Sequence, residues 1–285
     1  MAIQNVALIG AGIMGAGVAR NILKGGYAVA VYDINPEAVA ALEADGARAA
    51  TSAADAGRDA DIAITVLPAP VHLEAAVFGE DGLAGTLREG AILIQQSTVD
   101  PAAVVDLARR LEPQGVKVLD APMLRNPVAA AAGTLGFVIG GDEDALAAAV
   151  PIFDCMGEST EYLGPVGTGS ALKLVNNMLN ITILCAALEA TALGMKSGLT
   201  LKQMVTAFSK TSVWTRHLAT YPQVFEERDF TLGFMTALAH KDIRLAMHHA
   251  ASVEVPLNVA HAAYDLMARA EAQGYGRDQY FSVLR

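Results

Sequence analysis

Short apolar runs alternate with helical patterns over the first half of the chain. The candidate strands are residues 5–9, 28–33, 61–67, 91–97, 116–120 and 135–141. Each run has the length of a buried strand, and helical or alanine-rich segments separate them. Capping residues followed by proline, Asn35-Pro36 and Asp100-Pro101, mark two helix starts. The alternation predicts βαβ units and a mostly parallel sheet.

The pattern changes after the last of these runs, where the glycine-rich segment GPVGTGS predicts a turn or hinge. A continuous helical pattern follows over residues 170–196. Thr200 and Gln203 have the spacing of a capping box and predict a further helix start. No strand pattern follows them. We therefore expect an α/β domain over residues 1–163 and an all-helical domain over residues 164–285, joined by the long helix.

Composition narrows the possible functions. Hydrophobic residues make up 53% of the chain and charged residues 18%, which is enough for a large core. The formal net charge of −10 argues against a nucleic-acid partner, although it leaves room for a local cationic pocket. Cys155 and Cys185 lack the spacing of zinc or redox sites, so we expect two buried reduced thiols. The histidines form no H-E-x-x-H motif, so we expect no metal site.

The chain shows no pattern of membrane targeting. Its N-terminus, MAIQNVALIGAG, lacks the basic region of a signal peptide. The most apolar long stretch, residues 178–195, contains Asn180, Thr182 and Glu189 and fits a buried helix better than a membrane span. We therefore expect a soluble, cytoplasmic protein without a membrane partner.

The motif GAGIMG matches the G-x-G-x-x-G fingerprint of dinucleotide sites. It follows a candidate strand and opens a helical pattern, which is the context that makes the match specific. Gly10 permits a tight turn, Gly12 lets the backbone approach a pyrophosphate, and Gly15 allows close packing of helix on strand. The cofactor-binding residues expected here are Gly10, Ala11, Gly12, Ile13, Met14 and Gly15.

The second candidate strand ends at Asp33. A carboxylate in this place binds the adenosine ribose hydroxyls of NAD and repels the 2′-phosphate of NADP. Ile34 and Asn35 follow, with no arginine to accept that phosphate, so the sequence favours NAD over NADP.

Two later strand ends are expected to border the cofactor, because ligands bind outside the carboxyl ends of parallel strands. They carry Leu67 with Pro68, and Ser97 with Thr98.

A polar stripe lies at the start of the long helix. Lys173, Asn177 and Asn180 share one helical face, with Asn176 beside them. A lysine in a partly apolar cleft can serve as a general acid or base, and Asn177 would hydrogen-bond the reacting oxygen or orient the lysine. The alternative is a solvated first helical turn that happens to carry a lysine.

A second charged segment, LAHKDIRLA, places Lys241 and Asp242 beside His240 on a helix. A surface ion pair is the simplest interpretation of these residues. No G-x-S-x-G nucleophile motif is present in the sequence.

Together these segments resemble the β-hydroxyacid dehydrogenase family, which includes the 3-hydroxyisobutyrate dehydrogenases. The matching segments are GAGIMGAGVARNILKGGYAVAVYDINP, DAP…GTLGFVIGG, GTGSALKLVNN and AHKDIRLA. The resemblance implies an N-terminal Rossmann domain and a C-terminal helical domain joined by a long helix. It implies that Lys173 is the catalytic acid/base and that Asn177 holds the substrate. Thr98 would contact the nicotinamide side of NAD, and Lys241 would lie near the cofactor. Family members are commonly homodimers or homotetramers.

The loop DAPMLRN departs from the family pattern D-A-P-V-S-G-G. Leu124, Arg125 and Asn126 stand where Ser-Gly-Gly binds the substrate carboxylate. Arg125 offers a planar fork of donors for a carboxylate or sulfonate, and the sulfolactaldehyde reductases resemble this chain in that respect. Without the resemblance, a loop arginine would be read as a surface charge.

The expected function is an NAD-dependent interconversion of a short anionic 3-hydroxy acid and its semialdehyde. Lys173 moves the proton, and Arg125 with Asn126, Asn176, Asn177 and Asn180 binds the substrate. A sulfolactaldehyde reductase is the alternative. Imine reductases share the fold but usually lack the lysine, and a non-catalytic NAD-binding module is a further possibility.

Overall fold

The computed structural model describes residues 3–231 and 233–284. The chain divides into two compact units between Lys173 and Leu174, inside the long helix α8 (Thr168–Lys196). This division falls later than the boundary expected at residue 164, because the first turns of α8 pack on the strands of the first unit.

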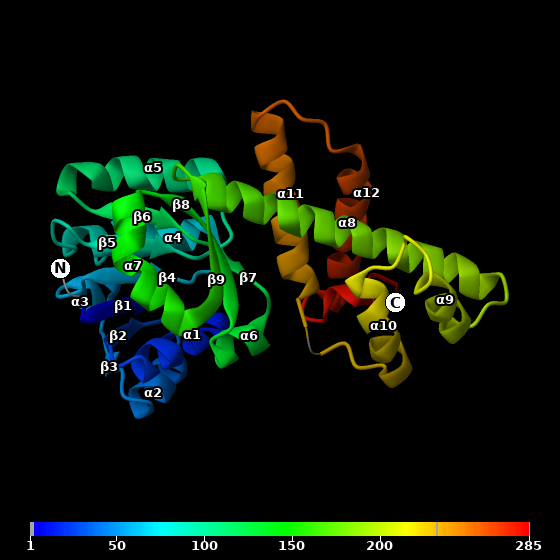
Figure 1. The fold of residues 1–285 in the computed structure, drawn as a ribbon, viewed down its shortest axis with the longest axis horizontal. Coiled ribbons are helices and arrows are strands. Elements are labelled where there is room, and N and C mark those ends of the chain that lie inside the picture. Colours follow the sequence, from blue (N-terminus) through cyan, green and yellow to red (C-terminus); the bar gives the residue numbers. More distant parts are fainter. Residues whose placement is uncertain (1–2, 232, 285) are drawn as a thin grey trace. The chain divides into compact units, whose positions relative to one another are not determined.

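A twisted sheet forms the centre of the first unit (Figure 1). Within the described residues it has nine strands in the order β3-β2-β1-β4-β5-β6-β8-β7, with β9 paired to β8. The strands are β1 (Asn5–Ile9), β2 (Ala28–Tyr32), β3 (Arg48–Ala49), β4 (Ile62–Thr65), β5 (Ile92–Gln95), β6 (Lys117–Asp120), β7 (Met123–Leu124), β8 (Leu135–Gly141) and β9 (Gly157–Gly164). Among the strand pairs that the structure describes in this sheet, β6–β8 and β7–β8 alone are antiparallel, so the mostly parallel sheet is confirmed.

Every candidate strand of the sequence is present, although several end a residue or two earlier than expected. The strands β3, β7 and β9 have no counterpart among the predictions. The first two contain only two residues each, too few for a hydrophobic pattern. The third, GESTEYLG, is polar and largely exposed at the edge of the sheet, so it contains no apolar run.

Helices cover both faces of the sheet. They are α1 (Ile13–Lys24), α2 (Pro36–Ala44), α3 (Ala53–Gly57), α4 (Pro70–Phe78), α5 (Pro101–Leu111), α6 (Pro127–Ala132) and α7 (Glu143–Met156). The predicted caps are confirmed, since Asn35 accepts a hydrogen bond from the Glu37 amide at 3.0 Å and Asp100 accepts one from the Ala102 amide at 2.9 Å. Short 3-10 turns lie at Leu83–Gly85 and Glu112–Gln114.

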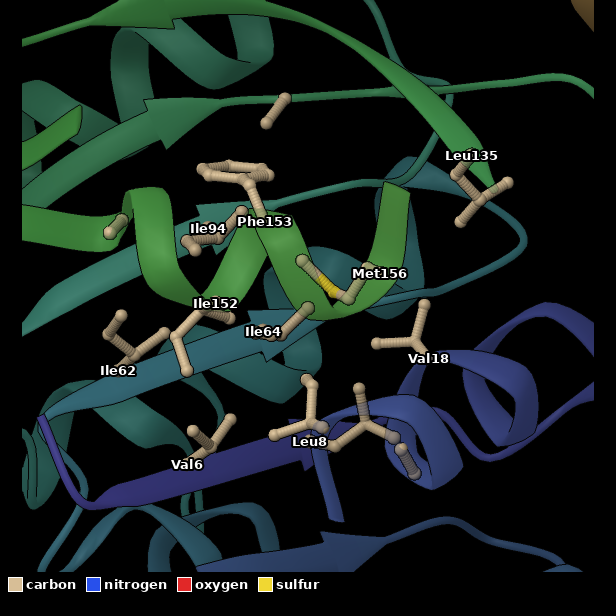
Figure 2. Packing of buried hydrophobic residues seen from close by; sticks show 14 of the residues in the cluster. Val6, Leu8, Val18, Ile62, Ile64, Ile94, Leu135, Ile152, Phe153 and Met156 are labelled. Atoms are coloured by element: carbon tan, nitrogen blue, oxygen red, sulfur yellow. The ribbon is translucent and has the colours of Figure 1, made fainter. Parts of the chain in front are cut away.

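The central strands β1, β4, β5 and β8 are buried on both faces, which explains their apolar runs. On one face, Val6 and Leu8 of β1 pack with helices α1, α2, α6 and α7. Figure 2 shows this layer, with Ile152 and Phe153 of α7 facing the strands. On the other face, residues of β1, β4 and β5 pack with α3, α4 and α5.

The second unit is helical. Besides the later part of α8 it contains α9 (Leu201–Phe208), α10 (Arg216–Glu227), α11 (Thr236–Ser252) and α12 (Asn258–Ala270), followed by single turns at Glu271–Tyr275 and Tyr280–Leu284. The predicted capping box of Thr200 and Gln203 opens α9 and is confirmed. Among the described residues of this unit, the one β-type pairing is an isolated bridge between Met235 and Gln279.

The long helix α8 has two apolar faces. Ile181, Leu184 and Leu188 are fully buried in the core of the second unit. Leu179 and Leu193, on the opposite face of the helix, are 53% and 71% exposed. In the part of the chain that the structure describes, only α8 is long and apolar enough to cross a membrane, a criterion that core helices of soluble proteins also meet. Only 28% of the most apolar 18-residue stretch of α8 is buried. The expected burial of this helix therefore holds for the face with Ile181, Leu184 and Leu188 alone.

Both cysteines are free thiols, as expected. Cys185 is buried, and burial raises the pKa of its thiol to about 12. Cys155, in the last turn of α7, is only half-buried, so the expectation of a buried thiol is wrong for it.

Candidate active site

The glycine-rich loop joins β1 to α1 in the way the motif predicts. Gly10 has φ +101°, and a Cβ there would overlap the carbonyl oxygen of Val66. A Cβ at Gly15 would overlap the carbonyl oxygen of Gly10. Gly12 is different, because a Cβ there would meet no protein atom within 4 Å. Gly12 is also the N-cap of α1 and makes no side-chain cap, so the helix N-terminus presents backbone N–H groups for an anion.

The Asp33 carboxylate is held beside this loop. Its Oδ2 accepts a hydrogen bond from the Ala11 amide at 2.6 Å, and its Oδ1 accepts one from the Asn35 amide at 2.8 Å. These two backbone donors fix the carboxylate next to the start of α1. Ile13 and Met14 form the first turn of that helix. The structure thus brings together the residues expected to bind the adenosine half of a dinucleotide.

The carboxyl ends of β4 and β5 continue the same edge of the sheet. The hydroxyl oxygen of Ser97 accepts a hydrogen bond from the Leu67 amide at 2.8 Å, which ties the two strand ends together. The Gln95 side chain braces Ser97 from its own strand, donating to the Ser97 carbonyl at 3.0 Å and accepting from its amide. Pro68 and Thr98 each follow one residue later, so all of these loop residues lie along one edge with the glycine-rich loop.

Lys173 lies at this edge as well. It sits in the second turn of α8, and its Nζ donates a hydrogen bond to the Met123 carbonyl at 2.6 Å. Met123 begins β7, shortly after β6, and β6 neighbours β5. Lys173 as a residue is partly buried. The structure therefore places the candidate acid/base in the same unit as the dinucleotide loop, at the carboxyl end of the same sheet.

Asn177 belongs to a polar cluster of the second unit. Its Nδ2 donates to Asp242 Oδ2 at 2.6 Å, and its Oδ1 accepts from Asn176 Nδ2 at 3.0 Å. Lys241 Nζ lies 3.0 Å from Asp242 Oδ1. Asp242 is 2% exposed, so its ion pair with Lys241 is buried. The interpretation of these two residues as a surface ion pair is therefore wrong. The bonds to Asp242 and Asn176 fix the orientation of the Asn177 amide.

Asn180 takes part in a different contact. Its Oδ1 lies 2.9 Å from His217 Nε2, and its Nδ2 donates to the Tyr280 hydroxyl at 3.4 Å. Burial lowers the pKa of His217, so the imidazole is neutral at neutral pH. The amide of Asn180 is thus used inside the second unit. Sequence reasoning missed His217 and Tyr280 because nothing in their spacing relates them to Asn180.

Arg125 has an unusual backbone and a partnered side chain. Its φ is +76°, a left-handed conformation at the position where the family pattern has glycine. Its Nη1 donates to the Thr134 carbonyl at 2.5 Å and to Glu158 Oε2 at 2.8 Å. The ion pair is half-exposed. Neighbouring Asn126 caps α6 by accepting from the Ala129 amide at 3.1 Å. Both side chains that replace the two glycines therefore have partners within the first unit.

The part of the chain that the structure describes contains no group of three or more metal-ligating side chains.

Two family models together cover almost the whole chain. Residues 5–164 match the NAD-binding domain of 6-phosphogluconate dehydrogenase. Residues 167–285 match the NAD-binding domain of NADP-dependent 3-hydroxyisobutyrate dehydrogenase.

Curated relatives match over nearly their full length. The chain is 37% identical to an NAD-dependent L-serine dehydrogenase of Pseudomonas aeruginosa, over 99% of this chain and 97% of the relative. It is 35% identical to the human mitochondrial 3-hydroxyisobutyrate dehydrogenase, over 98% of this chain and 85% of the relative.

Solved structures of the same family also match this chain over nearly its full length. The Mycobacterium tuberculosis 3-hydroxyisobutyrate dehydrogenase with L-serine has a TM-score of 0.92 at 28% identity, covering 99% of this chain and 98% of the other. The chain therefore belongs to the 3-hydroxyisobutyrate dehydrogenase family, within the β-hydroxyacid dehydrogenases, and is an NAD(P)-dependent 3-hydroxyacid dehydrogenase that acts on the CH–OH group.

Proposed function

We propose that this chain oxidises a short 3-hydroxy acid bearing a carboxylate to its semialdehyde, with NAD as the acceptor and with Lys173 as the proton-transfer group. The observation that carries the proposal is the hydrogen bond of 2.6 Å from Lys173 Nζ to the Met123 carbonyl. It holds an amine at the carboxyl edge of the sheet, where a dinucleotide bound at the glycine-rich loop would extend. The relatives named for 3-hydroxyisobutyrate and L-serine point to these two compounds as first substrates to test.

A bound NAD would supply the hydride acceptor for the carbinol carbon, and the glycine-rich loop with Asp33 would hold it. The uncharged amine of Lys173 takes the hydroxyl proton as the carbonyl forms, and the ammonium returns it in the reverse reaction. The Met123 carbonyl limits where the amine can lie, so little reorganisation is needed at the moment of transfer. Asn177, one helical turn further along α8, is the candidate to bind the polar end of the substrate.

NAD is the proposed cofactor because of Asp33. Its carboxylate is already oriented by the Ala11 and Asn35 amides, and it would repel a 2′-phosphate. Initial rates with NADH and NADPH over the same semialdehyde test this directly. Equal kcat/KM for the two reduced cofactors would contradict the preference.

A sulfonate substrate held by Arg125 is the second candidate. The Glu158 carboxylate already accepts from one guanidinium nitrogen, so a sulfonate would have to share Arg125 with it. A carboxylate substrate comes first and a sulfolactaldehyde reductase second, because the relatives are named for carboxylates, L-serine and 3-hydroxyisobutyrate. A panel of methylmalonate semialdehyde, succinic semialdehyde and sulfolactaldehyde separates them. A cyclic imine in the same panel tests the imine reductase alternative.

The deciding variant is Lys173→Ala. Loss of a positioned proton-transfer group is expected to lower kcat by about 10² to 10⁴, with NADH affinity unchanged. Lys196→Ala is the matched control, because Lys196 is exposed at the far end of the same helix. A folded Lys173→Ala protein with wild-type turnover would remove the lysine from the mechanism. A wild-type protein that binds NADH but turns over none of the carboxylate substrates would refute the proposed substrate class.

We also propose that the chain forms a homodimer or homotetramer. The support is the exposed apolar surface of α8, on which Val175, Leu179 and Leu193 are each more than half exposed. Such a face on a soluble protein marks a protein contact. Light scattering on the purified protein gives the mass, and a monomer at micromolar concentration would contradict the proposal.

A further inference from the structure

Asp120 is a fully buried carboxylate to which the mechanism above assigns no part. It ends β6 and has an exposed fraction of 0%. Its Oδ2 accepts a hydrogen bond from the Ser170 amide at 2.7 Å, and its Oδ1 accepts one from the Ser170 hydroxyl at 2.6 Å. Ser170 lies in the first turn of α8, so both carboxylate oxygens are bound to the beginning of the helix that carries Lys173.

The helix start is seated closely on the strands at this point. A Cβ at Gly169 would overlap the Asp120 carbonyl oxygen and would lie 2.7 Å from the Val138 carbonyl oxygen. A Cβ at Gly140 would overlap the Pro165 carbonyl oxygen. The backbone around the start of α8 therefore lies directly against the backbone of β6 and β8, beside Asp120.

Two contacts in register join the strand end to the helix. Asp120 binds Ser170, and three residues further along both segments Met123 binds Lys173. Ser170 and Lys173 are neighbours on one helical face, because residues three apart lie one above the other. The first contact therefore sets the rotation and height of α8, and these in turn decide where the amine of Lys173 lies.

Burying the Asp120 carboxylate at this contact between β6 and α8 is energetically unfavourable. Burial raises the pKa of Asp120, and its bonds to Ser170 act in the opposite direction. An apolar pair of similar volume would fill the same space without burying a charge. A carboxylate at a helix N-terminus gives what an apolar pair does not, which is directional bonds to a backbone N–H and an adjacent hydroxyl.

We propose that Asp120 is a positioning residue for Lys173, acting through Ser170 at the start of α8. It touches neither substrate nor cofactor. The inference rests on the proposed catalytic role of Lys173, but the placement of the amine can be measured without turnover.

The kinetic test uses Asp120→Ala, with Asp120→Asn as the conservative variant. Displacing the amine by about 1 Å is expected to lower kcat of Asp120→Ala about 10- to 100-fold, with NADH affinity unchanged. Asp120→Asn keeps an acceptor for the Ser170 amide and a donor for its hydroxyl, so it should recover most of kcat. In a Lys173→Ala background Asp120→Ala should cause no further loss, because both changes act through one group. Full additivity, or an unchanged kcat in Asp120→Ala, would overturn the proposal.

A second measurement separates this proposal from the proposed function. The rate at which a small amine-reactive ester labels Lys173 is followed by mass spectrometry as a function of pH, with exposed Lys196 as the internal reference. Asp120→Ala should change the Lys173 profile and leave that of Lys196 alone, even if no hydroxy acid is a substrate. If Asp120→Ala does not fold, Ser170→Ala takes its place. If Asp120→Ala lowers the melting temperature but leaves the pH dependence of Lys173 labelling unchanged, Asp120 stabilises the fold without positioning Lys173, and the proposal is wrong.

Discussion

Gly12 tests whether the space beside the glycine-rich loop belongs to the cofactor. A Cβ at Gly12 would meet no protein atom within 4 Å, and its φ of −62° and ψ of −175° suit any residue. Gly12→Ala should therefore leave the fold intact. The new methyl group would instead stand where a pyrophosphate must approach the backbone to reach the N-terminus of α1.

The two expected effects differ widely in size. Alanine is a poorer N-cap than glycine, but it also lowers the entropy of the unfolded chain, and these terms offset to within about 0.5 kcal/mol. The melting temperature should then move by less than about 2 °C. Losing two charge-assisted hydrogen bonds to phosphate removes about 3 to 6 kcal/mol, or about 10² to 10⁴ in NADH affinity.

Fluorescence titration with NADH and thermal unfolding of the same samples measure both effects. Gly15→Ala is the matched control, because a Cβ there would overlap the Gly10 carbonyl oxygen. That variant should lose both stability and NADH binding. A folded Gly12→Ala protein with wild-type NADH affinity would refute the placement of the cofactor at this loop.

Three further predictions concern single contacts. Asp33→Ser should raise the ratio of NADPH to NADH kcat/KM at least about 10-fold, because the carboxylate no longer repels the 2′-phosphate, and an unchanged ratio would exclude Asp33 as the selector. If Arg125 binds the substrate anion, Arg125→Ala should raise KM, and Glu158→Gln should lower KM because it removes the carboxylate that pairs with Arg125. An unchanged KM in both variants would mean that Arg125 serves only in its ion pair with Glu158. Burial lowers the pKa of His217 below its ordinary value of 6.5, so the unfolded chain binds more protons and stability should fall as the pH drops below 6.5. Urea unfolding at several pH values should show a smaller loss for His217→Gln, and an equal loss would assign it to other groups.

The sequence alone identified the elements whose signal is local. The strands β1, β4, β5 and β8 are buried on both faces, and β2 and β6 are buried in part, so each was visible as a short, mainly apolar run. The glycine-rich loop, the capping box of Thr200 and the proline-marked helix starts depend on a few consecutive residues and were predicted for the same reason. The polar edge strand β9 and the two-residue strands β3 and β7 lack such a pattern, because pairing with a neighbour rather than burial makes them strands.

The tertiary structure decided which polar groups meet. The ring nitrogen of His217 reaches Asn180, and the carboxylate of Asp242 reaches Asn177, over 37 and 65 residues of chain respectively. The ion pair of Arg125 with Glu158 depends on β9, which has no sequence signal. A side chain's type states what it can donate or accept, but its partner is whichever segment the packed fold brings within about 3 Å. The sequence could therefore propose Lys173 as the reacting group, while only the fold showed that Asp120 binds Ser170 at the start of α8 and that Met123 accepts a hydrogen bond from the amine.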